Sequence, residues 1–237
     1  MGRGSTTYDC NVMGIYQKIK RTKYKIENDA ESTGEEIANS ITHGMGALLS
    51  IVALSILVSL AVRKGDSWRI LGFSIYGSAL ILLYLSSTLY HSLIFTRAGR
   101  LFAVLDHAFI YILIAGTYTP FALVSIRSAL GWTLFGIIWG VAVIGVVFET
   151  FIVERRRVVS TIIYIVMGWM VMAAIKPLLM SISATGVSWL VAGGLLYTLG
   201  VIFFSWKRLP YHHMIWHFFV MGGSVCHFFA IYYYVLP

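Results

Sequence analysis

The residues best suited to chemistry lie in residues 211–229, YHHMIWHFFVMGGSVCHFF, which hold four of the seven histidines. His213 and His217 are four residues apart, so on a helix they share one face at a separation of about 5–6 Å. Two ligands of one metal ion can use this spacing. Histidines in an apolar run cost free energy unless they have partners, so this cluster indicates a functional site.

The composition indicates a membrane protein, because 58% of the 237 residues are apolar and only 12% are charged. A soluble domain has about 45–50% apolar and about 25% charged residues. The net charge of +8 does not indicate nucleic-acid binding, since the positive residues lie between apolar runs, where they set topology and contact anionic headgroups. The cysteines, Cys10 and Cys226, form neither a disulfide framework nor a CxxC motif.

The elements that must position the histidines are transmembrane helices. We expect an all-α integral membrane domain over residues 36–237, with seven helices that each cross a hydrocarbon core about 30 Å thick. The seven apolar runs are residues 43–62, 68–94, 104–126, 130–149, 158–178, 187–206 and 213–235.

A polar, basic tail over residues 1–35 precedes this domain, and we expect no cleaved signal peptide, because no apolar run follows Met1 closely. Within the tail, residues 12–26 mix five Lys/Arg with Ile and Tyr. This pattern fits an interfacial helix on an anionic leaflet, and it fits a plain positive tail equally well.

The positive charges predict the orientation. With a cytoplasmic N-terminus, thirteen of the eighteen Lys/Arg lie on the cytoplasmic side. The positive-inside rule therefore favours a cytoplasmic N-terminus and, with seven spans, an external C-terminus. We expect the protein to be a multi-pass component of the cell (cytoplasmic) membrane.

This topology brings six histidines to one membrane level, although they belong to four different spans. They are His43, His91, His107, His212, His213 and His217. Asp106 falls at the same level, whereas His227 lies about 15 Å deeper along the last span. Hydropathy alone does not require this clustering, so it predicts one site near the cytoplasmic face.

The residues predict a zinc site, with His91, His213 and His217 as ligands. Three neutral imidazoles and a water make the open coordination of a catalytic zinc, and zinc suits nitrogen ligands. Asp106 is placed to hydrogen-bond that water or to act as the general base. Ser87 lies one turn before His91, where its hydroxyl can orient the water or a substrate carbonyl.

The remaining polar residues have simpler interpretations. Glu36, Asn39 and His43 follow one helical stripe and fit either support of the metal ligands or an ordinary capped helix start. His107 and His212 are assigned to headgroup contact or packing. His227 can line the same cavity, and core packing is its simpler role.

Four blocks resemble a known family. They are EEIANSITHG (35–44), LSSTLYH (85–91), LDHAFIYILIAGTYTPF (105–121) and HMIWHFFVMGGSVCHFF (213–229). They resemble the bacterial haemolysin III-like proteins, the prokaryotic branch of the PAQR (progestin and adipoQ receptor) family. The resemblance covers nearly everything after residue 35, and the blocks occur in the family order.

The resemblance implies seven spans, a cytoplasmic N-terminus and a zinc site. The Ser-x-x-x-His block maps to Ser87 and His91, the Asp to Asp106, and the His-x-x-x-His block to His213 and His217. It implies that Asp106 holds the zinc-bound water, and it places the chain among membrane hydrolases that include the alkaline ceramidases.

Three functions follow as hypotheses. The first is a zinc-dependent hydrolase, ceramidase-like or lipase-like, whose substrate is an acyl-chain membrane lipid. The second is a receptor or regulator of membrane lipid homeostasis in which zinc is structural, and the third is a pore-forming haemolysin. The sequence names membrane lipids as partners and gives no indication of a nucleic-acid partner.

Overall fold

The computed structural model describes residues 31–152 and 157–237, and within this part of the chain the regular structure is entirely helical. The all-α class predicted from the sequence is therefore confirmed. The predicted interfacial segment 12–26 lies outside the described residues. The elements are α2 (Thr33–Lys64), α3 (Ser67–Leu93), α4 (Arg97–Pro120), η1 (Phe121–Ile126), α5 (Ala129–Ile152), α6 (Arg157–Trp169), η2 (Met170–Ala174), α7 (Ile175–Ser205) and α8 (His212–Tyr234).

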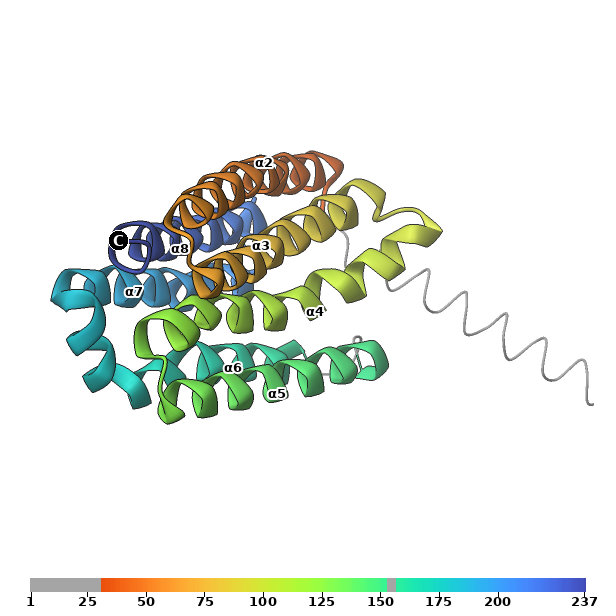
Figure 1. Ribbon diagram of the computed structural model, residues 1–237. Coiled ribbons are helices and arrows are strands. Elements are labelled where there is room, and N and C mark those ends of the chain that lie inside the picture. The colour runs from red at the N-terminus through yellow and green to blue at the C-terminus, as the bar shows by residue number, and fades with distance from the viewer. Residues whose placement is uncertain (1–30, 153–156) are drawn as a thin grey trace, which may run out of the picture.

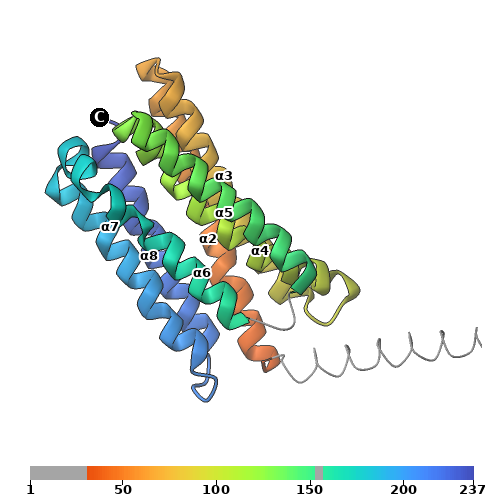
Figure 2. The same ribbon diagram turned by 90° about the horizontal axis from the view of Figure 1, so that it is seen from below.

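Six helical stretches in the described ranges are long and apolar enough to cross a membrane, which makes this a multi-pass integral membrane protein. One of them, Val158–Ser205, has 48 residues, and a straight helix of that length would measure about 72 Å. The stretch contains the 3₁₀ segment η2 and non-helical backbone angles at Ile182 and Ser183. Figure 2 shows α6 and α7 side by side, joined at the end opposite the α7–α8 connection. The count of seven spans stays a prediction.

Helix α2 begins ten residues before the apolar run expected at 43–62. Ser32 caps it: the Ser32 side chain accepts a hydrogen bond from the Glu35 backbone N–H, and the Glu35 carboxylate accepts one from the Ser32 backbone N–H. Such a capping box satisfies amide donors that a helix start leaves open. The first three turns of α2 are polar on the side that is buried in the protein, so a search for apolar residues alone misses them.

Close helix packing brings the site-bearing helices together. A Cβ at Gly46 of α2 would lie 2.8 Å from the Tyr84 ring of α3, and one at Gly116 of α4 would lie 2.7 Å from the Ala79 Cβ. Glycine is required at both crossings because any side chain would push the helices apart. The start of α2, the α3–α4 connection and the α7–α8 connection consequently lie at one end of the bundle (Figures 1 and 2).

Candidate metal centre

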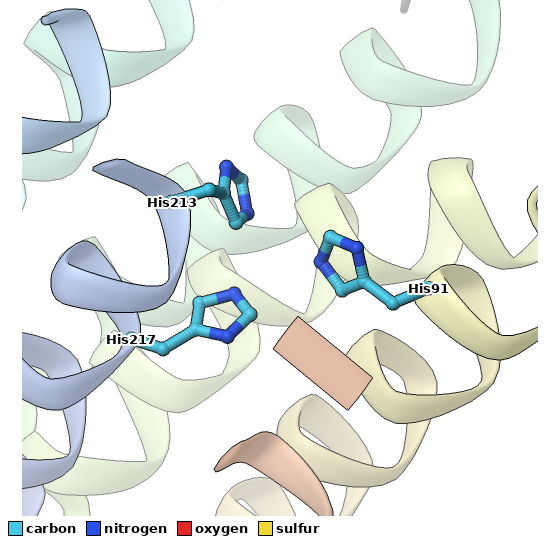
Figure 3. Close-up of side chains that lie close together, drawn as sticks. All are labelled: His91, His213 and His217. Atoms are coloured by element: carbon cyan, nitrogen blue, oxygen red, sulfur yellow. The ribbon is translucent and has the colours of Figure 1, made fainter. Parts of the chain in front are cut away.

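Three histidines meet at this end of the bundle. His91 comes from the last turns of α3, and His213 and His217 come from the first two turns of α8. One ring nitrogen from each lies within 4.8 Å of the other two. Figure 3 shows the three rings around a shared space between α3 and α8. This arrangement could hold a metal ion, and it unites the three residues that the sequence predicted as ligands.

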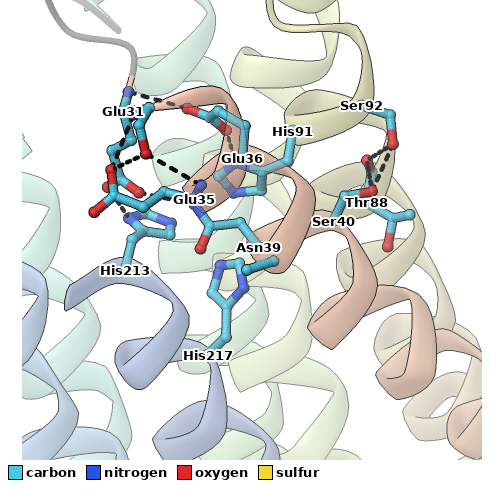
Figure 4. Close-up of polar contacts among 12 residues, drawn as sticks. Glu31, Glu35, Glu36, Asn39, Ser40, Thr88, His91, Ser92, His213 and His217 are labelled. Carbon is cyan, nitrogen blue, oxygen red and sulfur yellow. Dashed lines mark hydrogen bonds and ion pairs between the residues drawn. The ribbon is translucent and has the colours of Figure 1, made fainter. Parts of the chain in front are cut away.

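Glu36 of α2 holds the His91 ring. The His91 Nδ1 lies 2.7 Å from the Glu36 Oε2, and both side chains are buried (Figure 4). Because the carboxylate accepts, Nδ1 carries the hydrogen and Nε2 keeps its lone pair. That Nε2 is buried without a hydrogen-bond partner among the described residues. A ring held in this way, with its second nitrogen open, is what a metal-binding histidine requires.

Thr42 orients His217 by the same logic. The Thr42 hydroxyl lies 2.9 Å from the backbone carbonyl oxygens of Ala38 and Asn39, and it donates its one proton to them. The Thr42 oxygen therefore accepts a hydrogen bond from the His217 Nδ1, at 3.0 Å. The His217 Nε2 is then left with its lone pair. His43 stacks on the His217 ring, with centroids 3.4 Å apart and planes 13° from parallel. The ring of His217 is therefore fixed from two sides.

Glu31 lies beside His212 and His213 at the start of α8. Its carboxylate is 3.1 Å from the His212 Nε2 and 3.8 Å from the His213 Nδ1, and it accepts a 2.9 Å hydrogen bond from the Asn39 amide (Figure 4). Burial raises the pKa of the Glu31 carboxyl, while the Asn39 amide and the nearby His212 lower it. Glu31 thus joins the start of α2 to the start of α8 directly above the three histidines.

A cavity of about 180 Å³ adjoins the histidines. His43, Ser87, Asp106, His213 and His217 line one end of it, and apolar side chains of α4, α6, α7 and α8 line most of the rest. Asp106 is buried, although it does not belong to the group of three converging histidines. Ser87 is 1% exposed, and its buried hydroxyl has no hydrogen-bond partner in the described part of the chain.

The structure thus places every residue singled out from the sequence at or beside one site, with His227 at the inner part of the same cavity. His212 is apart from the three converging rings: its Nδ1 donates to the Phe203 carbonyl at 3.1 Å. Sequence reasoning missed Thr42 and Glu31. The available signal for Thr42 was its hydroxyl, which comes directly before His43 in a helix with a polar stripe. Nothing in the sequence of the tail distinguished Glu31 from the other polar residues there.

The fold and the site define the class of this protein. It is a multi-pass helical membrane protein in which three histidines converge at one end of the bundle. Within that class the chain belongs to the haemolysin-III related family, whose sequence profile matches residues 32–228. The family resemblance seen in the sequence is confirmed.

Three relatives illustrate the range of the similarity. The chain is 52% identical to Hemolysin-3 of Bacillus cereus over 203 residues, covering 86% of this chain and 93% of the relative. It is 50% identical to the Hemolysin-3 homolog of Bacillus subtilis (strain 168), covering 84% and 94% of the two chains. It is 30% identical to the human Monocyte to macrophage differentiation factor, covering 85% and 84%. No solved structure has significant similarity to the chain.

Proposed function

We propose that this protein is a zinc-dependent integral membrane hydrolase that cleaves an amide or ester bond of a membrane lipid. One observation carries the proposal: three buried or half-buried imidazoles converge beside a cavity in the membrane domain that is lined mostly by apolar side chains. An acyl chain fits the apolar part of such a cavity, and its carbonyl would lie near the histidines.

The residues present fit a zinc ion. All three candidate ligands are imidazoles, which zinc accepts readily, and the tautomers set by Glu36 and Thr42 leave Nε2 lone pairs on His91 and His217. The Nε2 of His91 is buried and lacks a protein partner in the described ranges, and a bound zinc ion would supply that partner. Zinc held by three histidines polarises a carbonyl group and lowers the pKa of water.

Asp106 and Ser87 supply the remaining chemistry. Asp106 takes a proton from the attacking water, whose oxygen bonds to the carbonyl carbon, and then delivers that proton to the leaving amine or alcohol as the original bond breaks. Ser87 donates a hydrogen bond to the carbonyl oxygen, where negative charge develops. The cavity keeps other water away from the reacting atoms.

The proposed topology has seven spans, with the N-terminus and the metal site on the cytoplasmic side and the C-terminus outside. It is supported by the distribution of Lys and Arg. It is also supported by the 48-residue stretch Val158–Ser205, which is far longer than one crossing needs and contains the non-helical angles at Ile182 and Ser183.

Metal analysis and lipid hydrolysis test the two halves of the proposal separately. We expect one zinc per purified protein, and we expect it to be lost in His213→Ala. We expect zinc to be retained in Asp106→Ala, because Asp106 is not a ligand in this proposal. We expect the release of free fatty acid from a lipid extract to cease in the same variant.

Absence of zinc from the wild-type protein would refute the metal site. Stoichiometric zinc without any fatty acid release from sphingolipid or glycerolipid amides and esters would refute the hydrolase and favour a regulator with structural zinc.

A second candidate function rests on the names of the relatives, since the two Bacillus proteins are called Hemolysin-3 and Hemolysin-3 homolog. A pore-forming activity would release dye from sealed liposomes that contain the pure protein, and it would not depend on the histidines. Dye release that persists in His213→Ala would favour the pore. Dye retention by wild-type protein that hydrolyses lipid would favour the enzyme.

A further inference from the structure

The inner part of the cavity contains a polar group that the metal site does not use. His227 lines the cavity, ten residues beyond His217 on α8, which corresponds to about 15 Å along a helix. Its Nε2 lies 3.2 Å from the Leu190 carbonyl oxygen of α7. Because a carbonyl only accepts, Nε2 carries the hydrogen and Nδ1 of the neutral ring is an acceptor. That Nδ1 is buried and has no partner among the described residues.

The backbone of α7 is shaped around this ring. A Cβ at Gly193 would lie 2.5 Å from the His227 Nε2 and 2.4 Å from its Cδ2. Only glycine leaves room for the imidazole to reach the Leu190 carbonyl. The orientation of His227, and therefore the position of its open Nδ1, is fixed by a bond on one side and a close contact on the other.

Tyr197 offers the complementary group. Its ring lies 5.5 Å from the His227 ring, and it also lines the cavity. The Tyr197 hydroxyl is 2.7 Å from the Ser224 hydroxyl, which is 2.7 Å from the Tyr84 hydroxyl. Three hydroxyls have three protons, and the two bonds of this chain use two of them. When Tyr84 donates to Ser224 and Ser224 donates to Tyr197, the Tyr197 proton is not used within this chain of hydroxyls and can serve a ligand.

We propose that His227 and Tyr197 form a binding site for one hydroxyl group, carried in the middle of an acyl chain that occupies the cavity. A hydroxyl can donate to the His227 Nδ1 and accept from the Tyr197 Oη at once, whereas a hydrocarbon chain leaves both unpaired at a cost in free energy. The lipid head lies at the histidine end, about 15 Å away. This inference concerns what the cavity holds, so it stands whether or not the protein turns over a substrate.

Competition binding to the purified full-length protein tests the proposal, with octadecanoate and 12-hydroxyoctadecanoate as competitors of a fluorescent fatty acid. We expect the hydroxylated acid to bind about tenfold more tightly, because it satisfies two otherwise unpaired groups. We expect His227→Leu and Tyr197→Phe each to reduce the ratio of the two dissociation constants to near one. The apparent melting temperature in detergent, measured on the same samples, shows that the fold of each variant is intact.

Tyr76→Phe is the matched control. Its hydroxyl donates to the backbone carbonyl of Ser224, and the residue does not line this cavity, so the variant is expected to keep the tenfold preference. A third probe, 2-hydroxyoctadecanoate, carries its hydroxyl beside the head, and we expect its binding to be insensitive to His227→Leu. Equal binding of the first two acids by wild-type protein, failure of both to compete, or a preference that survives in both His227→Leu and Tyr197→Phe would overturn the proposal.

Discussion

At the residue scale, the contact between Glu36 and His91 connects the polar start of α2 to the three histidines. We predict that Glu36→Gln weakens zinc binding by about 10–100-fold, the usual effect of losing a carboxylate that orients a ligand. The amide keeps the size of the side chain while removing its charge. Competition with a chelator of known affinity measures the change, and a saturating zinc concentration should restore full occupancy.

Glu35→Gln is the control for this prediction. Glu35 is the neighbouring acid, but its carboxylate accepts from the backbone N–H groups of Ser32 and Tyr211 rather than from a histidine. Its replacement should leave the zinc affinity within about twofold of wild type, since no ligand ring moves. Equal losses of affinity in the two variants would mean that Glu36 acts only through the general charge of this region.

The buried hydroxyl of Ser87 leads to a second prediction. It has no partner among the described residues, so Ser87→Ala should leave the thermal stability unchanged or slightly raised. If Ser87 donates to the substrate carbonyl, the same variant should lower kcat by about 10²-fold with zinc retained.

Ser86→Ala provides the comparison for Ser87, because the Ser86 hydroxyl is also buried but donates to the Leu83 carbonyl. It should retain wild-type turnover. A normal kcat in Ser87→Ala would remove Ser87 from the proposed chemistry, and a shared loss in both variants would point to a disturbed α3.

The predictability of the site depends on whether a residue's position follows from local spacing or from tertiary packing. The spacing of His213 and His217 and the shared membrane level of His91 follow from helix geometry and topology, and the structure brings the three together. The contact between Thr42 and His217 depends on how α2 is rotated against α8. The spacing of residues along one segment gives no information about that rotation.

At the element scale, the junction between α4 and α5 gives a third prediction. A Cβ at Gly145 would lie 2.4 Å from the ring of Tyr111, which is fully buried and cannot move aside. We predict that Gly145→Ala destabilises the protein by about 1–3 kcal/mol, as overpacking in a core does. The apparent melting temperature in detergent measures the change, with the loss of monodisperse protein on heating as the signal.

The same helix offers a control at Gly140, where an added Cβ meets nothing within 4 Å. Gly140→Ala should be neutral or stabilising by up to about 1 kcal/mol, since alanine is the better helix former. A loss of stability in Gly140→Ala equal to that in Gly145→Ala would show that α5 needs flexible glycines rather than close packing against α4.

The elements themselves were predicted to different degrees. Apolar runs located the membrane-embedded parts of α3, α4, α5 and α8, because length and hydropathy are local properties. They did not locate the start of α2, which depends on Ser32 capping and on burial of a polar face. The gap between the predicted runs 158–178 and 187–206 contains the non-helical angles at Ile182 and Ser183. The runs did not reveal the 3₁₀ segment Met170–Ala174, because hydropathy does not distinguish an α-helix from a 3₁₀ helix.

At the scale of the whole molecule, the number of crossings between residues 158 and 205 decides the side on which every later segment lies. If α6 and α7 are separate spans, a reporter fused after residue 182 is external, one after residue 208 is cytoplasmic, and one after residue 237 is external. If the stretch crosses once, the positions after residues 208 and 237 exchange sides. We predict the first pattern, because a 48-residue stretch would be about 72 Å long in a core of about 30 Å.

Paired fusions to alkaline phosphatase, which is active outside, and to green fluorescent protein, which fluoresces inside, distinguish the two topologies. Green fluorescence from the fusion after residue 237 would contradict the proposed topology of seven spans with an external C-terminus.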